Sequence, residues 1–189
     1  MDLDVHHMGC DLLANSLHKW LLAPMGTGVL FVRKDIQRRF MPLLAGSGTW
    51  DIRESGADRY EAIGTYAAPI RAGIGAALAF IKNIGMENII ARNRLMSDHF
   101  KSRVAEIPGL RLMTSESYAL SSPGITTVEV EGWHARSLRS ALQERHNITV
   151  SSDTADGNNG LRISTHFYNT PQEVDKVVDA IKDLLQPPM

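Results

Sequence analysis

The chain has 189 residues, 43% of them apolar, so it can bury a substantial core in one large domain or two small ones. Its 20 basic and 21 acidic residues nearly cancel, and no basic run stands out, which argues against nucleic acid or an anionic membrane as a partner. The single cysteine excludes an internal disulfide, and no apolar stretch is long enough to span a bilayer.

The start of the chain, MDLDVHHMGCD, is acidic and lacks the basic, apolar and small-residue order of a signal peptide. A lone cysteine, Cys10, also fits a reducing compartment. We therefore expect a cytoplasmic location, although an export signal in a longer precursor would lie outside this sequence.

The first half of the chain predicts two strands that flank Lys19. Residues 27–33, TGVLFVR, are β-branched and aromatic enough for a buried strand, and residues 9–16 predict a shorter strand before it. Residues 34–68 show little periodicity and predict a long irregular connection of the kind that often carries function. The Ala- and Gly-rich segment 69–84 predicts a closely packed helix, with proline in its first turn and glycine after its end.

The second half predicts helices and strands that alternate. A helix that stops at the Pro-Gly pair 108–109 has one apolar face, formed by Ile89, Met96, Phe100, Val104 and Ile107. A second helix is expected from about His134 to Arg145. Strands are expected at LRLM (110–113), GITTVEVEG (124–132), ITVS (148–151) and LRIS (161–164).

The last helix has the clearest signature in the chain. Thr170 is expected to cap it, Pro171 suits its first position, and Glu173 completes a capping box. Its apolar stripe is formed by Val174, Val177, Ile181 and Leu184.

The alternation of strands and helices predicts an α/β fold in two parts. Residues 86–189 are expected to form a compact α+β domain of their own. Residues 1–85 instead indicate part of a larger domain.

Lys19 is the residue whose surroundings suggest chemistry. A lysine amine must be unprotonated to attack a carbonyl, and we expect the apolar run Trp20, Leu21 and Leu22 to provide the burial that favours the neutral form. Ser16 and His18 add a hydroxyl and an imidazole, both good partners for a phosphate oxygen. The combination suggests a phosphorylated carbonyl cofactor. The alternative from spacing alone is a lysine that snorkels at the surface.

Three segments in order carry a family resemblance. SLHKWLLAPMGTGVLFVR (16–33) resembles the lysine segment of the class V aminotransferases, which are fold-type I enzymes that use pyridoxal 5'-phosphate (PLP). RYEAIGT (59–65) resembles their Arg-x-Glu…Gly-Thr element. LRISTHFYNTPQEVDKVVDAI (161–181) resembles their C-terminal Arg-x-Ser strand, Tyr-Asn-Thr turn and final helix.

The resemblance implies a role for each matching residue. Lys19 would form the Schiff base with the cofactor and act as the base that moves the α-proton of an amino-acid substrate. Ser16 and His18 would hold the cofactor phosphate, and Gly64 and Thr65 would reach the phosphate of the neighbouring subunit in a homodimer. On residue type alone Arg162 is an ordinary exposed strand arginine. The resemblance implies instead that it binds the substrate α-carboxylate in a bidentate pair.

Two departures narrow the resemblance. The loop SSDTADGNNG (151–160) has no cysteine where cysteine desulfurases and many selenocysteine lyases carry a catalytic one, so desulfuration through a persulfide is disfavoured. The run HKWLLAP, and the spacing in which Ala62 and Ile63 precede Gly-Thr, are more similar to the isopenicillin N epimerase-like branch. Members of that branch carry out racemisation, transamination or elimination.

The family's phosphate loop, ring-stacking residue and pyridinium Asp all lie upstream of the lysine, which here is preceded by 18 residues. Asp2, Asp4 and Asp11 are not at the position of that Asp. The chain is thus expected to be the C-terminal portion of a fold-type I enzyme, with residues 1–85 from the large PLP-binding domain and 86–189 as the small domain. Two alternatives stay open: a truncated, non-catalytic remnant that acts in self-association or partner binding, and a selenocysteine lyase or cysteine desulfurase-like activity.

Other candidate residues have simpler explanations. His6, His7, Cys10 and Asp11 fit no standard zinc spacing, so no metal site is expected. His166 has two interpretations: it lies near Arg162 and selects substrate, or it hydrogen-bonds in the turn before the last helix. Trp50 and Trp133 are typical of a core, and the alternatives are a pocket or a dimer interface.

Overall fold

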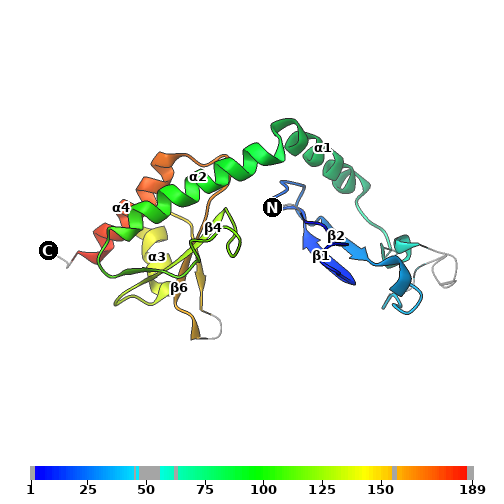
Figure 1. Ribbon diagram of the computed structural model, residues 1–189, viewed down its shortest axis with the longest axis horizontal. Coiled ribbons are helices and arrows are strands. Elements are labelled where there is room, and N and C mark those ends of the chain that lie inside the picture. Colours follow the sequence, from blue (N-terminus) through cyan, green and yellow to red (C-terminus); the bar gives the residue numbers. More distant parts are fainter. Residues whose placement is uncertain (1–2, 45, 47–55, 62–63, 155–156, 187–189) are drawn as a thin grey trace. The chain divides into compact units, whose positions relative to one another are not determined.

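The structure is a computed structural model that describes residues 3–44, 46, 56–61, 64–154 and 157–186. The chain forms two compact units, Met1–Gly85 (unit 1) and Met86–Met189 (unit 2), and each is described by itself. Both units combine helices with a small antiparallel sheet (Figure 1), so the expected α/β class is confirmed.

Unit 1 begins with a two-stranded antiparallel hairpin. Strand β1 (Leu12–Ser16) pairs with β2 (Gly28–Val32), with Leu12 opposite Val32 and Ser16 opposite Gly28. The two strands predicted around Lys19 are therefore confirmed, but the expected burial of the second is wrong, because only Val32 of β2 is buried while Val29 and Leu30 are exposed. Two short 3₁₀ helices, η1 (Lys34–Ile36) and η2 (Ala57–Glu61), lie in the connection that sequence periodicity left irregular.

Helix α1 (Ala68–Ile84) completes unit 1 within one residue of the predicted range, with Pro69 in its first turn. It ends at Gly85, which has a φ of 89° that a residue with a side chain adopts only at a cost. Gly73 lies so close to the hairpin loop that a Cβ added there would stand 2.4 Å from Cγ of Pro24. The small residues of α1 thus permit a close approach.

Unit 2 packs three helices on one face of a four-stranded sheet. The helices are α2 (Met86–Ala105), α3 (Ala135–His146) and α4 (Pro171–Leu185). The strands are β3 (Leu110–Leu112), β4 (Ile125–Val130), β5 (Ser151–Asp153) and β6 (Gly160–Ser164). They pair antiparallel in the order β3-β4-β6-β5, so β6 lies between β4 and β5.

The core of unit 2 lies between the sheet and its helices. Alternate residues of β4 and β6 face the helices, whereas the other face of the sheet carries polar and half-buried side chains. The predicted apolar face is confirmed, since all five of its residues are buried, although α2 ends at Ala105 and Ile107 lies in the turn after it. The core cluster includes Met96, Phe100, Val104, Val128, Val130, Leu138, Leu142, Leu161, Ile163, Val174, Val178, Ile181 and Leu184.

Helix α4 confirms its predicted start. The Thr170 hydroxyl accepts from the backbone N–H of Glu173 at 3.2 Å, and the Glu173 carboxylate accepts from the backbone N–H of Thr170 at 2.8 Å. Val178, which the predicted stripe omitted, is fully buried, whereas Val177 is only partly buried against the core.

The strand predicted at residues 148–151 is displaced. Only Ser151 belongs to β5, which runs to Asp153. The backbone N–H of Ile148 donates to the Leu142 carbonyl at 3.1 Å, so it closes the C-terminus of α3 instead of joining the sheet. Asn147, in the left-handed conformation with a φ of 54°, makes that closure possible.

No single helix in the described residues is long and apolar enough to cross a membrane. By length and composition alone, only α1 and α2 taken together would meet that test.

Candidate functional site

Lys19 lies in the loop of residues 17–27 that joins β1 to β2. The backbone closes this loop twice at its base, because Leu17 N–H donates to Thr27 O and Ala23 N–H donates to Leu17 O, both at 3.1 Å. Residues 19–22 form a tight turn, in which the backbone N–H of Leu22 donates to the carbonyl of Lys19 at 3.1 Å. These hydrogen bonds therefore fix the backbone of Lys19 in the loop of the hairpin.

The hairpin also positions the two candidate phosphate ligands. Ser16 is the last residue of β1 and its side chain is exposed. Nδ1 of His18 lies 3.1 Å from the Thr27 carbonyl. Because a carbonyl only accepts, Nδ1 carries a proton and Nε2 is the ring atom left for another partner. A second donor bond from Nε2 to an anion requires the cationic form of the ring.

The expected burial of Lys19 is wrong. Lys19 is exposed, and two of the three apolar residues thought to cover it are themselves open, with Trp20 38% and Leu22 37% exposed. Consecutive residues of a tight turn point outward in different directions, and Leu22 takes a left-handed φ of 61° that turns the chain back. Within the described part of unit 1, neighbours in sequence do not form an apolar pocket around the amine.

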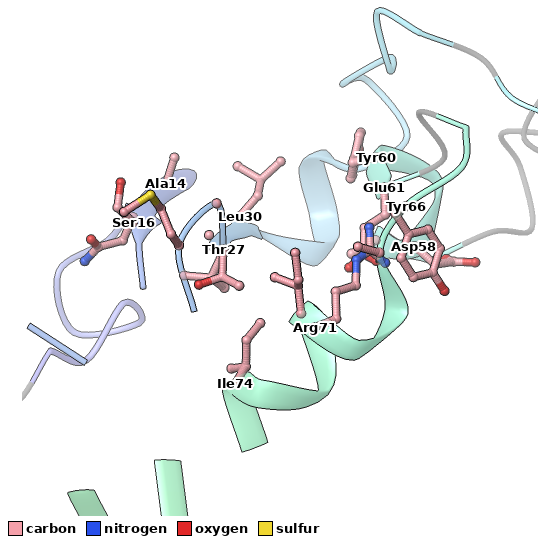
Figure 2. A pocket seen from close by; sticks show the side chains of 18 residues that line it. Ala14, Ser16, Thr27, Leu30, Asp58, Tyr60, Glu61, Tyr66, Arg71 and Ile74 are labelled. Atoms are coloured by element: carbon pink, nitrogen blue, oxygen red, sulfur yellow. The ribbon is translucent and has the colours of Figure 1, made fainter. Parts of the chain in front are cut away.

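An open hollow of about 880 Å³ lies in unit 1 between the hairpin and the segment from η2 to α1. Figure 2 shows Ser16 and Thr27 on its hairpin side, with Tyr66 and Arg71 on the opposite side. His18 and Lys19 are not among the lining residues. Of the predicted phosphate ligands, the structure thus brings only Ser16 to the hollow.

The first residues of the RYEAIGT motif, 59–61, are anchored by their charged side chains. Arg59 is 1% exposed, and its Nη2 donates to the Tyr60 hydroxyl at 2.8 Å. Arg71 holds Glu61 at 2.8 Å and lies 3.7 Å above the Tyr66 ring. Sequence reasoning missed Tyr66 and Arg71, because only the folded chain brings them to the same hollow as Ser16.

Gly64 and Thr65 follow this anchored segment and are exposed. Gly64 has a φ of 109°, a conformation that favours glycine, and leaves open space where a Cβ would lie. Ala62 and Ile63, the two residues before Gly-Thr that resemble the isopenicillin N epimerase-like branch, lie outside the described residues.

Arg162 belongs to unit 2, in the middle of β6. It is exposed on the open face of the sheet, directly opposite Thr127 of β4 and Ser151 of β5. Its guanidinium makes no ion pair or hydrogen bond within the described residues.

The carboxylates and histidines near the N-terminus have protein partners. Oδ1 of Asp4 accepts from the backbone N–H groups of His7 and His6, and these bonds hold the pKa of Asp4 below its usual value. Oδ1 of Asp11 pairs with Arg33 at 2.6 Å. The described residues contain no group of three or more His, Cys, Asp or Glu side chains that could hold a metal ion. Asp2 lies outside the described residues.

His166 is buried in the turn between β6 and α4. Its Nδ1 accepts from the backbone N–H of Phe167 at 2.8 Å, and its ring stacks on Tyr168 at 4.8 Å. These contacts favour the interpretation of His166 as a turn residue. Trp133 is partly buried against the core of unit 2, while Trp50 lies outside the described residues.

The connection between β5 and β6 contains no cysteine, since the single cysteine of the chain, Cys10, is in unit 1.

Comparison with known proteins finds relatives that match this chain over nearly its whole length. The isopenicillin N epimerase of Streptomyces clavuligerus is 32% identical, with 97% of this chain and 50% of that protein covered. A cysteine desulfurase of Haloferax volcanii is 30% identical, with 95% and 45% covered. The chain spans about half the length of the curated relatives it matches.

Two solved structures have a similar fold. An apo cysteine desulfurase from Thermococcus onnurineus NA1 matches with a TM-score of 0.81 and 26% identity, covering 96% of this chain and 48% of that one. A C-DES mutant with glycine covalently linked to its PLP cofactor matches with a TM-score of 0.80 and 21% identity, at the same coverage of 96% and 48%. The aminotransferase class V family matches residues 1–177. This chain therefore belongs to the aminotransferase class V family.

Proposed function

We propose that this chain contributes to a PLP-dependent reaction on an amino acid, with Lys19 as the cofactor lysine. The observation that carries the proposal is the closed hairpin loop, which presents the hydroxyl of Ser16, the imidazole of His18 and the amine of Lys19 within four residues. A hydroxyl and an imidazole beside a primary amine are the groups that a phosphorylated aldehyde needs.

Ser16 and His18 are proposed to hold the phosphate. The Ser16 hydroxyl opens onto the hollow of unit 1, and the His18 ring is oriented by its bond to Thr27 O. In this role Nε2 of His18 is the ring atom that faces the phosphate, because Nδ1 is engaged by Thr27 O. Gly64 and Thr65 are proposed to reach the phosphate bound by the other subunit of a homodimer, and both are exposed as that requires.

PLP supplies an electron sink that stabilises negative charge at the α-carbon of a bound amino acid. The proposed task of Lys19 is to remove and return the α-proton through its Nζ. Arg162 is proposed to hold the α-carboxylate, because its guanidinium is exposed and without a carboxylate partner in the described residues.

Among the reactions of the family, we favour racemisation, transamination or elimination over desulfuration through a persulfide. A persulfide needs a cysteine thiolate near the substrate sulfur. The β5–β6 connection supplies none, and Cys10 precedes β1 in the other unit.

We propose that unit 1 is the C-terminal part of the large PLP-binding domain and unit 2 the small domain. Homodimer formation is the second function that an observation favours. The two-stranded sheet of unit 1 exposes apolar residues, with Leu12 42%, Val29 47% and Leu30 44% exposed, and an isolated two-stranded sheet is only marginally stable in water. Sedimentation equilibrium should show a dimer, and a monomer at all concentrations would contradict this second function.

The cofactor proposal is tested by titrating the purified chain with PLP and following the absorbance of the bound cofactor. Wild type and Lys34→Ala, an exposed lysine of the same unit, should bind with equal affinity. Lys19→Ala should lose the visible band. Equal bands in Lys19→Ala and wild type would show that other amines carry the cofactor and would overturn the proposal.

A further inference from the structure

Arg162 lies in a row of polar side chains that crosses the open face of the unit 2 sheet. Strand pairing sets Thr127 directly opposite Arg162 on one side and Ser151 directly opposite it on the other. Residues paired in this way point to the same face, with Cβ atoms about 4.5–5.5 Å apart. The guanidinium therefore has a hydroxyl-bearing neighbour on each side.

The three side chains of this row have no partners among the described residues: neither hydroxyl and no N–H of the guanidinium makes a hydrogen bond there. Two carboxylates lie diagonally from Arg162 on this face, Glu129 two residues along β4 from Thr127 and Asp153 two residues along β5 from Ser151, and neither forms an ion pair with Arg162. Glu129 is occupied by Arg111, whose Nε donates to it at 3.0 Å. The row is thus a set of donors that the protein leaves available.

Thr127 is held in place more firmly than an open sheet face requires. A Cβ at Gly160 would lie 2.5 Å from Cγ2 of Thr127 and 3.3 Å from Sδ of Met113, so the threonine methyl fills the space that the glycine leaves. The backbone of Thr127 is fixed as well, because its N–H donates to Oγ1 of Thr114 at 2.8 Å. Since threonine has a stiff χ1, fixing the methyl also fixes the hydroxyl.

We propose that Thr127 and Ser151 complete the carboxylate site of Arg162, an inference that rests on the proposed function. A guanidinium donates two parallel N–H bonds to a carboxylate, and each carboxylate oxygen keeps a further lone pair. The two flanking hydroxyls donate to those lone pairs. Gly160 is a positioning residue that keeps Thr127 in the required rotamer.

The test measures the binding of acetate, which presents a carboxylate alone, to the full chain by nuclear magnetic resonance of the arginine Nε–H groups and backbone amides. Wild type should show saturable shifts at Arg162 and Ser151. Arg162→Lys should weaken binding more than tenfold, because a single ammonium cannot make the paired contact. Thr127→Val and Ser151→Ala should each weaken it about three- to tenfold.

Control variants distinguish a specific effect of this row of side chains from a general effect of surface charge on acetate binding. Arg139→Lys and Ser137→Ala change exposed residues of α3 and should leave the affinity for acetate unchanged. Thr127→Ser restores the hydroxyl without the methyl that orients it and should recover only part of the binding that Thr127→Val loses. Gly160→Ala should weaken binding by displacing the methyl of Thr127.

The outcomes distinguish this inference from the proposed function. Full affinity in Thr127→Val and Ser151→Ala, with loss in Arg162→Lys, would overturn the inference and leave Arg162 as the carboxylate ligand. No saturable shift in wild type, or equal binding in every variant, would overturn both the row and the role of Arg162. The assignment of Lys19 stands or falls separately, by the titration with PLP.

Discussion

The two units of the chain differ in how they are held together. Unit 2 has a continuous core between a four-stranded sheet and three helices. In the described part of unit 1 the buried apolar residues are few, namely Ala23, Val32, Ala77 and Ile81, while the hairpin exposes apolar side chains. Polar contacts therefore carry a larger share of the structure in unit 1, among them the hydrogen bonds of its hairpin loop and the Arg71–Glu61 ion pair. The candidate cofactor residues lie in the less buried unit, which is where local opening is expected to be easiest.

The largest effect should come from the core of unit 2. Phe100 is 0% exposed, so Phe100→Ala removes a buried ring and should cost about 3–5 kcal/mol of unfolding free energy. Leu30→Ala, at a residue 44% exposed in the hairpin, should cost less than about 1 kcal/mol. Urea unfolding followed by hydrogen exchange in each unit measures both. Similar losses at the two positions would contradict the difference between the units.

A second change targets the close approach in unit 1. Gly73→Ala places a Cβ 2.4 Å from Cγ of Pro24, whose ring cannot swing away, and should destabilise unit 1 by about 1–3 kcal/mol. Gly75→Ala is the matched control, because a Cβ there meets nothing within 4 Å and should stabilise the helix by up to about 1 kcal/mol. Amide exchange in the loop of residues 17–27 should rise in the first variant alone.

A smaller effect is expected at the N-terminus of α4. Thr170→Ala removes the hydroxyl that accepts from the backbone of Glu173 and should cost about 1 kcal/mol. Thermal unfolding of unit 2 measures the loss. An unchanged midpoint would mean that the cap contributes nothing to this helix.

The smallest effect concerns pH at the same cap. The backbone N–H of Thr170 and the amide of Asn169 hold the pKa of Glu173 below its usual value. Its stabilising contribution is therefore present above the pKa of the unfolded state and is lost as pH falls through the lower pKa of the folded state. Glu173→Gln should flatten the dependence of unfolding temperature on pH in this acidic range. If unfolding temperature depended on acidic pH equally in wild type and Glu173→Gln, Glu173 would not contribute to that dependence.

Sequence patterns predicted most of unit 2 because its signals are local or periodic. The capping box at Thr170 and the apolar face of α2 each depend on residues close together in the sequence, and both were confirmed. The strand at 148–151 was misplaced because the backbone of Ile148 closes the end of α3, a competition that strand propensity does not include. Side-chain pairing across β4, β6 and β5 depends on strand register, so the neighbours of Arg162 could not be predicted.

In unit 1 the sequence indicated which residues to examine but not their environment. The two strands around Lys19 follow from β-branched composition and were confirmed. Burial of Lys19 was inferred from its apolar neighbours in sequence, yet the tight turn leaves those neighbours exposed. Ser16, Tyr66 and Arg71 line one hollow although they are far apart in sequence. They come together only when the segment that leads into α1 folds back beside the hairpin, and no local sequence pattern predicts that.

The most direct test of the cofactor assignment is to reduce the complex with PLP by borohydride and to map the modified peptide by mass spectrometry. We expect one pyridoxyl group per chain, confined to Lys19, with Lys34→Ala labelled as fully as wild type. Labelling spread over surface lysines, and equal in Lys19→Ala, would contradict it.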